Sequence, residues 1–465
     1  MVPASPLSRL SRLEPAITLA EIAQTLQDEP LITAQEIKAF YCKDVQPLRG
    51  IDRMGQMRLG MEDALSAHKY FRAFFLGHPG VGKTTELGNL LLNMASEFRP
   101  LRISVLSELN PGTFRFYDLL LLILLRLVQA VQQPMVIGFS DSDVEPLFQR
   151  VRDHLSSKWT KHLRTQSGDF GAGLKLPFLS LFGNLKLGAS KQHGEEEYEV
   201  SFVSELVQLT NDVFAECNEL LNKHQKQSWI LVVEDFEKIG LAPSKIRETF
   251  IGLRPSLQDL NAHILVTIPI WLRNAEDASI VLPANYGAFL LPDLPVYDRA
   301  HSKDEKVVAT LAAVVTARVQ ERLFDAGVLE RCCIASGGNI RDLFSLIREA
   351  MLSARLRKAS TISAADADGA VISLRNQYKQ YLGSTGQNPA EINLDQKLDR
   401  LTSIYKREDP TAEVPDRVLY QLLQQRCVLQ YNGNMWMGVH PLVVDLLMDF
   451  KKLLSDAPGG SRVPS

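Results

Sequence analysis

The stretch Gly77-His78-Pro79-Gly80-Val81-Gly82-Lys83-Thr84 decides the fold. It matches the P-loop (Walker A) pattern G-x-x-x-x-G-K-[ST], whose glycines let backbone N–H groups converge on phosphate oxygens. The apolar run Phe71–Leu76 precedes it, and helical spacing from Thr84 to Phe98 follows, so the motif has its strand–loop–helix context. In such a loop Lys83 reaches the β- and γ-phosphates, and Thr84 offers its hydroxyl to Mg²⁺. The predicted nucleotide-binding residues are Gly77, His78, Pro79, Gly80, Val81, Gly82, Lys83, Thr84 and Thr85.

A second element of the phosphate site is the segment Trp229-Ile230-Leu231-Val232-Val233-Glu234-Asp235, an apolar strand ending in two carboxylates. A P-loop needs such a strand end, because one acid helps to hold Mg²⁺ while its neighbour polarises the attacking water. We assign Glu234 to the metal, together with Thr84, and Asp235 to the water. The residues alone leave this division of roles open.

The pattern from residue 46 to 300 alternates apolar runs with helical segments, which is typical of a parallel sheet in an α/β fold. Further strands are predicted at Leu101–Leu106, His263–Ile268 and Phe289–Leu291, each short and continuously apolar. Beyond Asp298 the spacing becomes helical. Three helices are predicted there: Asp304 to Ala326, Ile340 to Lys358 and Ala364 to Leu382.

The C-terminal module follows a polar linker at 383–389 and has the element order of a winged helix. It is predicted as helices at 395–406 and 415–425, strands at 428–431 and 435–439 around Asn432-Gly433, and a helix after Pro441. We therefore expect five parts. They are an N-terminal extension (1–45), a P-loop core (46–300) with a basic hairpin insert (149–191), a helical lid (301–385), a winged helix (386–455) and a disordered tail (456–465).

These motifs resemble AAA+ ATPases in their order along the chain: the P-loop, the acidic strand end, the strand containing Thr267, and Gly337-Gly338-Asn339-Ile340-Arg341 opening a helix. With the winged helix, the chain resembles the branch of origin-recognition initiators and STAND signalling ATPases. The resemblance implies ATP and Mg²⁺ as cofactors. It implies that Thr267 holds the sensor 1 position, near the γ-phosphate or the water, and that Arg341 holds the sensor 2 position. On residue type alone, Thr267 could equally be a buried strand threonine and Arg341 an ordinary N-terminal helix residue.

The same resemblance implies that Leu48-Arg49-Gly50-Ile51-Asp52-Arg53 cradles the adenine. It also implies an arginine finger acting across a subunit boundary, for which Arg254 and Arg273 both remain open. The family usually ends its acidic strand with Asp-Glu or Asp-Asp, whereas this chain has Glu234-Asp235. Efficient hydrolysis and slow, switch-like hydrolysis therefore both remain open.

Charge limits the choice of partners. Fifty-one basic and 54 acidic residues leave a net charge of −3, so no global positive field favours nucleic acid or anionic lipid. Locally, residues 149–191 hold eight basic residues against two acids, whereas residues 391–450 hold six against nine. The basic insert is either a solvated loop or a partner-binding hairpin. An acidic winged helix favours contact with protein over contact with DNA phosphates.

Two functional hypotheses follow. The first is a STAND-like ATPase switch that oligomerises on ATP and controls a separately encoded effector, with bacterial defence or stress signalling as the setting the resemblance implies. The second is a DNA-acting AAA+ ATPase, which would use the basic insert. A cytoplasmic location is expected, because the most apolar stretch, Leu119–Leu125, is too short for the roughly 20 residues of a membrane span. The five cysteines contain no C-x-x-C pair, which argues against a zinc site or a disulfide framework.

Overall fold

The computed structural model describes residues 12–110, 114–131, 146, 149, 151, 197–238, 243–273, 282, 284–383, 392–431 and 436–461. The predicted basic insert at 149–191, apart from residues 149 and 151, lies outside these described residues. So does the predicted Asn432-Gly433 turn.

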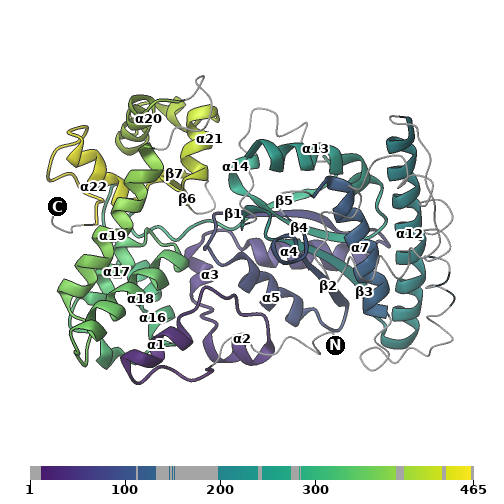
Figure 1. Ribbon diagram of the computed structural model, residues 1–465, viewed down its shortest axis with the longest axis horizontal. Coiled ribbons are helices and arrows are strands. Elements are labelled where there is room, and N and C mark those ends of the chain that lie inside the picture. The colour runs from purple at the N-terminus through teal and green to yellow at the C-terminus, as the bar shows by residue number, and fades with distance from the viewer. Residues whose placement is uncertain are drawn as a thin grey trace.

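A parallel sheet of five strands in the order β2-β3-β4-β1-β5 forms the core, which confirms the predicted fold class (Figure 1). Its strands are β1 (Arg72–Gly77), β2 (Phe98–Ser104), β3 (Ser228–Glu234), β4 (His263–Pro269) and β5 (Gly287–Leu290). The register pairs Ser104 with Glu234 and Phe75 with Thr267. The carboxyl ends of β1, β2, β3 and β4 therefore meet at one edge of the sheet.

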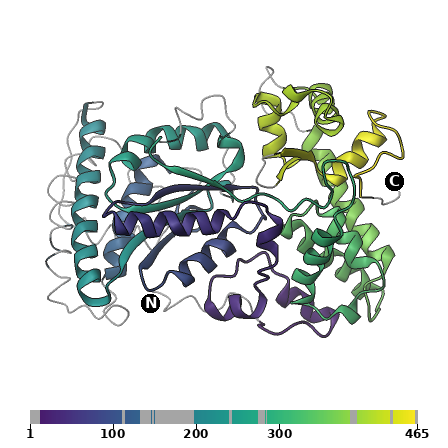
Figure 2. The ribbon, with the colours of Figure 1, turned by 180° about the vertical axis from the view of Figure 1, so that it is seen from behind.

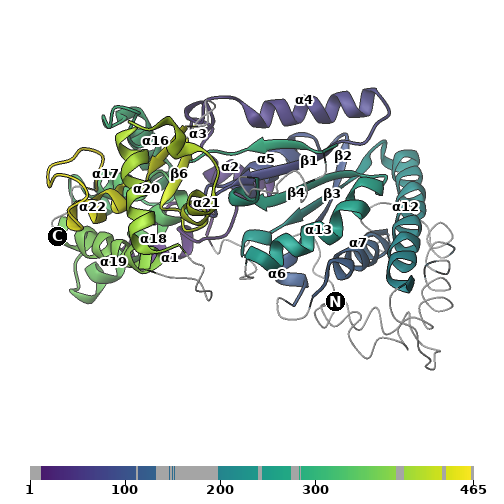
Figure 3. The same ribbon diagram turned by 90° about the horizontal axis from the view of Figure 1, so that it is seen from above.

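Helices cover both faces of the sheet (Figure 3). On one face lie α4 (Arg53–Ser66) and α5 (Lys83–Asn93); on the other lie α7 (Phe116–Val131), α12 (Glu197–Gln225) and α13 (Pro243–Asp259). Because successive strand residues point to opposite faces, Ala73 and Phe75 pack in the α4–α5 core while Phe74 and Leu76 pack in the α7–α12 core. Continuously apolar strands are the result of burial on both sides.

The lid and the C-terminal module lie together beyond one end of the sheet core (Figure 2). The lid helices are α16 (Glu305–Thr316), α17 (Val328–Ala335), α18 (Ile340–Leu356) and α19 (Ala364–Gly383). The N-terminal segment forms α1 (Leu19–Thr25), α2 (Ala34–Phe40) and α3 (Val45–Leu48). Three short elements follow core strands: α6 (Val105–Glu108), η1 (Phe236–Lys238) and α14 (Ile270–Arg273). A fourth, η2 (Glu321–Leu323), lies between lid helices α16 and α17.

Three predicted boundaries are wrong. The helix expected from Asp304 ends at Thr316, and the helix after the P-loop ends at Asn93 because Phe98 already begins β2. The strand expected over Leu101–Leu106 gives way at Val105 to α6, whose N-cap Ser104 accepts a hydrogen bond from the Ser107 N–H.

The C-terminal module contains the predicted elements in the predicted order. They are α20 (Leu394–Lys406), η3 (Pro410–Glu413), α21 (Arg417–Gln424), β6 (Val428–Tyr431), β7 (Trp436–Val439) and α22 (Pro441–Asp449), with β6 and β7 antiparallel. Its identity as a winged helix stays a prediction.

The C-terminal tail corrects the expectation of disorder over 456–465. Tyr405 donates its hydroxyl to the Pro458 carbonyl, and Tyr297 donates to the Gly460 carbonyl, both at 2.7 Å. The Ser461 N–H donates to Asp445 at 3.0 Å. The tail is therefore docked as far as Ser461, and residues 462–465 lie outside the described part of the chain.

In the described part of the chain, no helix combines the length and the apolarity needed to cross a bilayer. The apolar run Leu119–Leu125 lies within α7 and is buried in the core.

Candidate active site

The P-loop connects β1 to α5 through backbone conformations that favour glycine. Gly77, Gly80 and Gly82 have φ values of 155°, 87° and 103°. A Cβ at Gly80 would also lie 2.4 Å from the Asn339 side-chain oxygen, so the lid approaches the loop too closely for any other residue. Gly82 precedes the first residue of α5, which puts the positive end of the helix dipole and its unpaired N–H groups at the loop.

Lys83 is buried, with 4% of its surface exposed, and its ammonium folds back over the loop. Its Nζ donates to the carbonyls of Gly77 (2.9 Å) and His78 (3.1 Å). The neighbouring Thr85 was predicted to bind nucleotide. Its Oγ1 accepts a hydrogen bond from the Leu31 N–H at 3.1 Å, so Thr85 joins the P-loop helix to the N-terminal segment.

Glu234 lies at the end of β3 with 6% of its surface exposed. Burial raises the pKa of this carboxyl, against the opposing effects of the Arg102 guanidinium and the Thr84 hydroxyl. Its Oε2 accepts from Arg102 Nε at 3.0 Å, whereas its buried Oε1 has no hydrogen-bond partner among the described residues. A buried carboxylate with an unpartnered oxygen, beside the Thr84 hydroxyl, fits the hard oxygen ligands that Mg²⁺ takes.

Asp235 is held differently from its neighbour. Its Oδ2 accepts from the Ser104 hydroxyl and its Oδ1 pairs with Lys238 Nζ, both at 2.6 Å. Burial favours a higher pKa, but Lys238 and Ser104 outweigh it, and the pKa of Asp235 lies below its ordinary value. The residue also has a φ of 75°, unusual for a non-glycine residue. The two acids therefore differ in charge environment although they are adjacent in sequence.

The proposed sensor residues both lie near these groups. Thr267 on β4 is 1% exposed, and its hydroxyl accepts from the Asp235 N–H at 3.2 Å. Arg341 is the second residue of α18 and lies beside the P-loop, where its own N–H donates to the Gly80 carbonyl at 3.3 Å and its side chain lines the pocket above the loop. Tertiary structure thus brings the strand threonine and the lid arginine to the same site as the P-loop.

The arginine-finger candidates lie away from this pocket within the chain. Arg254 is on α13, and Arg273 ends α14 with an exposed side chain. Neither lines the pocket over the P-loop.

The pocket extends from the P-loop to the N-terminal segment and the lid. Its lining is drawn from the loop after α1, from residues 40–45, from the P-loop and from the lid, with Lys238 at the acidic end. The segment expected to be an extension outside the core is therefore part of the site. Among the described residues, no group of three or more histidine, cysteine or acidic side chains is placed to hold a metal ion.

Leu48–Arg53 does not line this pocket, and its role at the adenine stays a prediction. Arg49 is instead 2% exposed beneath the P-loop, where its guanidinium donates to the carbonyls of Pro292 and, at 2.8 Å, Val81. Its role is to hold the loop from below.

Arg318 was missed by the sequence reasoning. It is 6% exposed and lies on the pocket wall with its guanidinium 5.1 Å from the Phe40 ring and 5.2 Å from the Phe344 ring. Burial lowers its pKa to about 10, so it stays a cation at neutral pH. No motif could have revealed it, because its two aromatic partners lie in distant segments of the chain.

The sheet order, with the P-loop between β1 and α5, is the fold of P-loop NTPases of the AAA+ type. No protein-family model matches the chain, and no curated protein matches it.

Solved structures with similar folds include the following three proteins. The Aeropyrum pernix ORC1 protein, solved in complex with DNA, is 12% identical, with 85% of this chain and 91% of that chain covered and a TM-score of 0.37. A Walker-type ATPase of Pyrococcus abyssi is 13% identical, with coverage of 91% and 99% and a TM-score of 0.39. The Thermotoga maritima RuvB Holliday junction branch migration motor is 12% identical, with coverage of 90% and 100% and a TM-score of 0.35.

Proposed function

We propose that this chain is a Mg²⁺-dependent ATP-binding and ATP-hydrolysing switch that changes conformation or oligomerises on ATP to control a partner effector. The observation that carries the proposal is the convergence at one site of Lys83, Thr84 and Arg341 with the acidic end of β3. These groups come from the P-loop, the lid and the sheet. A ligand that contacts all of them couples the three parts of the chain.

The residues divide the chemistry as follows. Backbone N–H groups at the start of α5 bind phosphate oxygens, and Lys83 neutralises the β- and γ-phosphates. Thr84 and Glu234 hold Mg²⁺, for which the unpartnered Oε1 of Glu234 is a suitable ligand. The bound ion neutralises developing phosphate charge. Asp235 polarises the attacking water, Thr267 fixes the Asp235 backbone, and Arg341 binds the γ-phosphate from the lid.

To act on water, Asp235 must accept it beside its present partners or exchange one of them. Both of its carboxylate oxygens are occupied, by Ser104 and Lys238. Lys238 also lines the pocket, where the γ-phosphate is a competing anion for its ammonium. This arrangement supports slow, gated hydrolysis, as a switch requires.

The C-terminal module favours the switch over DNA binding. Four of the six basic residues in its segment 391–450 are used inside the fold: Lys397 donates to the Leu382 carbonyl, Arg400 pairs with Asp416, Arg407 covers the Trp436 ring, and Arg426 pairs with Asp342. Basic groups engaged in this way are poor donors to a phosphate backbone, on which DNA affinity depends. The alternative, a DNA-acting ATPase, is favoured only by the charge of residues 149–191.

The proposal is tested by measuring ATP turnover and molar mass in solution with ATP, ADP and a non-hydrolysable analogue, with and without duplex DNA. The switch predicts a nucleotide-dependent change in mass or hydrodynamic radius that DNA does not alter. A strict monomer of constant radius under every nucleotide would contradict it. A salt-dependent stimulation by DNA that is lost on neutralising Lys175 and Lys186 would favour the alternative.

A further inference from the structure

His78, the second residue of the P-loop, faces away from the nucleotide pocket. It does not line the pocket, and its ring Nδ1 lies 2.6 Å from Asp293 Oδ2. The two side chains are at most 1% exposed. Burial alone would raise the pKa of Asp293, but His78, with Arg49 and Asn339, holds it below its ordinary value. A polar pair enclosed this completely links two segments separated by 215 positions in the chain.

Asp293 contacts three parts of the molecule at once. Its carboxylate holds His78 of the P-loop and, at 3.4 Å, the Asn339 amide that caps lid helix α18. Its backbone N–H donates to the Gln430 carbonyl of β6 at 3.0 Å, and a bridge pairs it with Tyr431. One residue therefore touches the P-loop, the lid and the C-terminal hairpin β6–β7.

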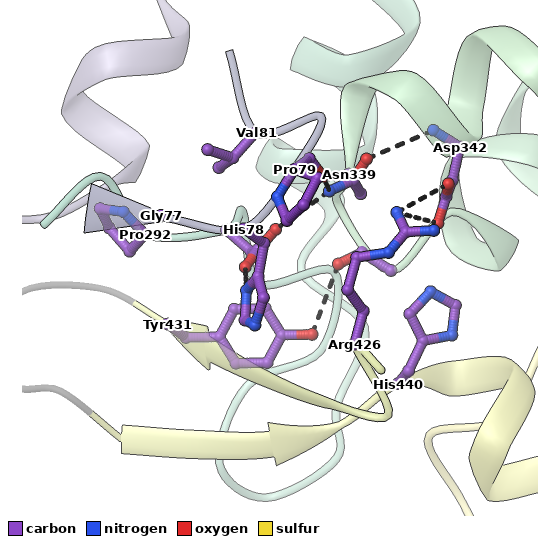
Figure 4. A network of polar contacts seen from close by, with 12 residues as sticks. Gly77, His78, Pro79, Val81, Pro292, Asn339, Asp342, Arg426, Tyr431 and His440 are labelled. Carbon is purple, nitrogen blue, oxygen red and sulfur yellow. Dashed lines mark hydrogen bonds and ion pairs between the residues drawn. The ribbon is translucent and has the colours of Figure 1, made fainter. Parts of the chain in front are cut away.

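Asn339, the lid residue of this contact, is also connected to the β6–β7 hairpin. Asn339 also donates to the Pro79 carbonyl of the P-loop at 3.0 Å, and its Oδ1 accepts from the Asp342 N–H. Asp342 pairs with Arg426, just before β6, at 2.9 and 3.0 Å (Figure 4). Two polar routes, through Asp293 and through Asn339, thus connect the P-loop to the β6–β7 hairpin.

The glycines of the lid motif allow a close approach that any larger residue would prevent. A Cβ at Gly338 would lie 1.8 Å from the Leu294 carbonyl oxygen, and one at Gly337 would lie 2.7 Å from the His440 ring. The lid turn is packed directly between the residue after Asp293 and the residue after β7. Such tight packing transmits displacements, because close-packed groups cannot absorb them.

The P-loop end of these routes responds to phosphate. Lys83 Nζ donates to the carbonyl of His78, the residue whose ring holds Asp293. Phosphate oxygens compete for the same ammonium, so phosphate binding changes the hydrogen bonding of the His78 peptide. Because the His78 ring contacts Asp293, a change at the His78 peptide reaches Asp293 through the His78 side chain.

We propose that His78 and Asp293 are positioning residues through which nucleotide at the P-loop sets the docking of the β6–β7 hairpin. This inference rests on the proposed function, because it needs a nucleotide at the P-loop, and it specifies how that nucleotide regulates the C-terminal module. The surface that the docked hairpin covers, and that the undocked hairpin exposes, is then what the switch presents to its partner.

The test is hydrogen–deuterium exchange of peptides spanning residues 427–440 in the full chain, with and without saturating ATP and Mg²⁺. In the wild type, ATP changes the exchange rate of these peptides by at least about fivefold, the lower range of allosteric coupling. Asp293→Ala binds ATP within about threefold of the wild type, but the change in hairpin exchange falls below about twofold. Asp293→Asn, which keeps an acceptor for His78, retains an intermediate response.

Asp445→Ala is the matched control. Asp445 is also a buried aspartate and is 5% exposed, but it binds Ser461 at the far side of the C-terminal module. It should lower stability without removing the response to ATP. Equal responses in Asp293→Ala and the wild type, or equal losses in Asp293→Ala and Asp445→Ala, overturn the inference. If the wild-type protein binds ATP but its hairpin does not respond, only this inference is overturned. If the wild-type protein does not bind ATP, the proposed function is overturned as well.

Discussion

Replacing Glu234 with glutamine tests the site most sharply, because one change should have opposite effects on stability and on metal binding. The substitution removes a charge from a side chain that is 6% exposed and keeps an oxygen able to accept from Arg102 Nε, 3.0 Å away. Arg102 is itself partly exposed, so it can be solvated when it loses its ion pair. The charge gives little stability here and costs desolvation.

The expected gain in the free energy of unfolding at pH 7.5 is about 1 kcal/mol, the lower end of the penalty for an unsatisfied buried polar group. Burial raises the pKa of Glu234 in the folded state above its ordinary value, so folding makes this carboxyl easier to protonate. The wild type therefore recovers stability as the pH falls through that raised pKa, and the advantage of Glu234→Gln should shrink between pH 7.5 and pH 4.5.

Metal binding should respond in the opposite direction. Losing a charged Mg²⁺ ligand is expected to cost about 1.5–3 kcal/mol, or roughly 10- to 150-fold in the Mg²⁺-dependent part of ATP affinity. Calorimetric titration of ATP with Mg²⁺ and with EDTA measures that part, and urea unfolding at the two pH values measures stability.

Asp235→Asn is the matched control at the adjacent position. The pKa of Asp235 is lowered, so its carboxylate contributes stability above its ordinary pKa that is lost as the pH falls through the folded-state value. Asp235→Asn should therefore be less stable than the wild type at pH 7.5, bind ATP and lose turnover. Unchanged Mg²⁺ dependence in Glu234→Gln, or a loss of stability equal to that of Asp235→Asn, would refute the reasoning.

Three further predictions concern the loop, the lid and the hairpin. Lys83→Ala should weaken ATP binding by roughly 10- to 150-fold, since a charged donor contributes about 1.5–3 kcal/mol; titration at constant Mg²⁺ checks this. Gly338→Ala should lower the free energy of urea unfolding by about 3 kcal/mol or more, because φ is 85° and the added Cβ would meet the Leu294 carbonyl. Burial lowers the pKa of His440 to about 4, so stability present above pH 6.5 should be lost progressively toward pH 4. Measured by urea unfolding, His440→Phe should reduce this acid-induced loss of stability by about half, because His263, whose pKa is also lowered to about 4, accounts for the rest. An unchanged pH profile in His440→Phe would exclude His440 as a source of the loss.

The core elements could be predicted because their signals are local. Residues 77–84 specify their own turn through glycine conformation, and β1, β3 and β4 are apolar runs whose neighbours in sequence already indicate burial on two faces. The order Glu234-Asp235 at a strand end likewise indicates an acidic site. Boundaries were less accurate where a cap or the next strand decided them, as at Ser104 and Asn93.

By itself, therefore, the sequence determined the P-loop, the parallel sheet and the composition of the acidic strand end. Only the tertiary structure decided which groups serve as partners: Arg102 for Glu234, Lys238 and Ser104 for Asp235, and Asp293 for His78. It also brought the N-terminal segment and Arg318 to the pocket and docked the tail as far as Ser461. The physical reason is that backbone conformation follows from near neighbours, whereas the charge state and orientation of a buried side chain depend on groups that folding brings from distant segments.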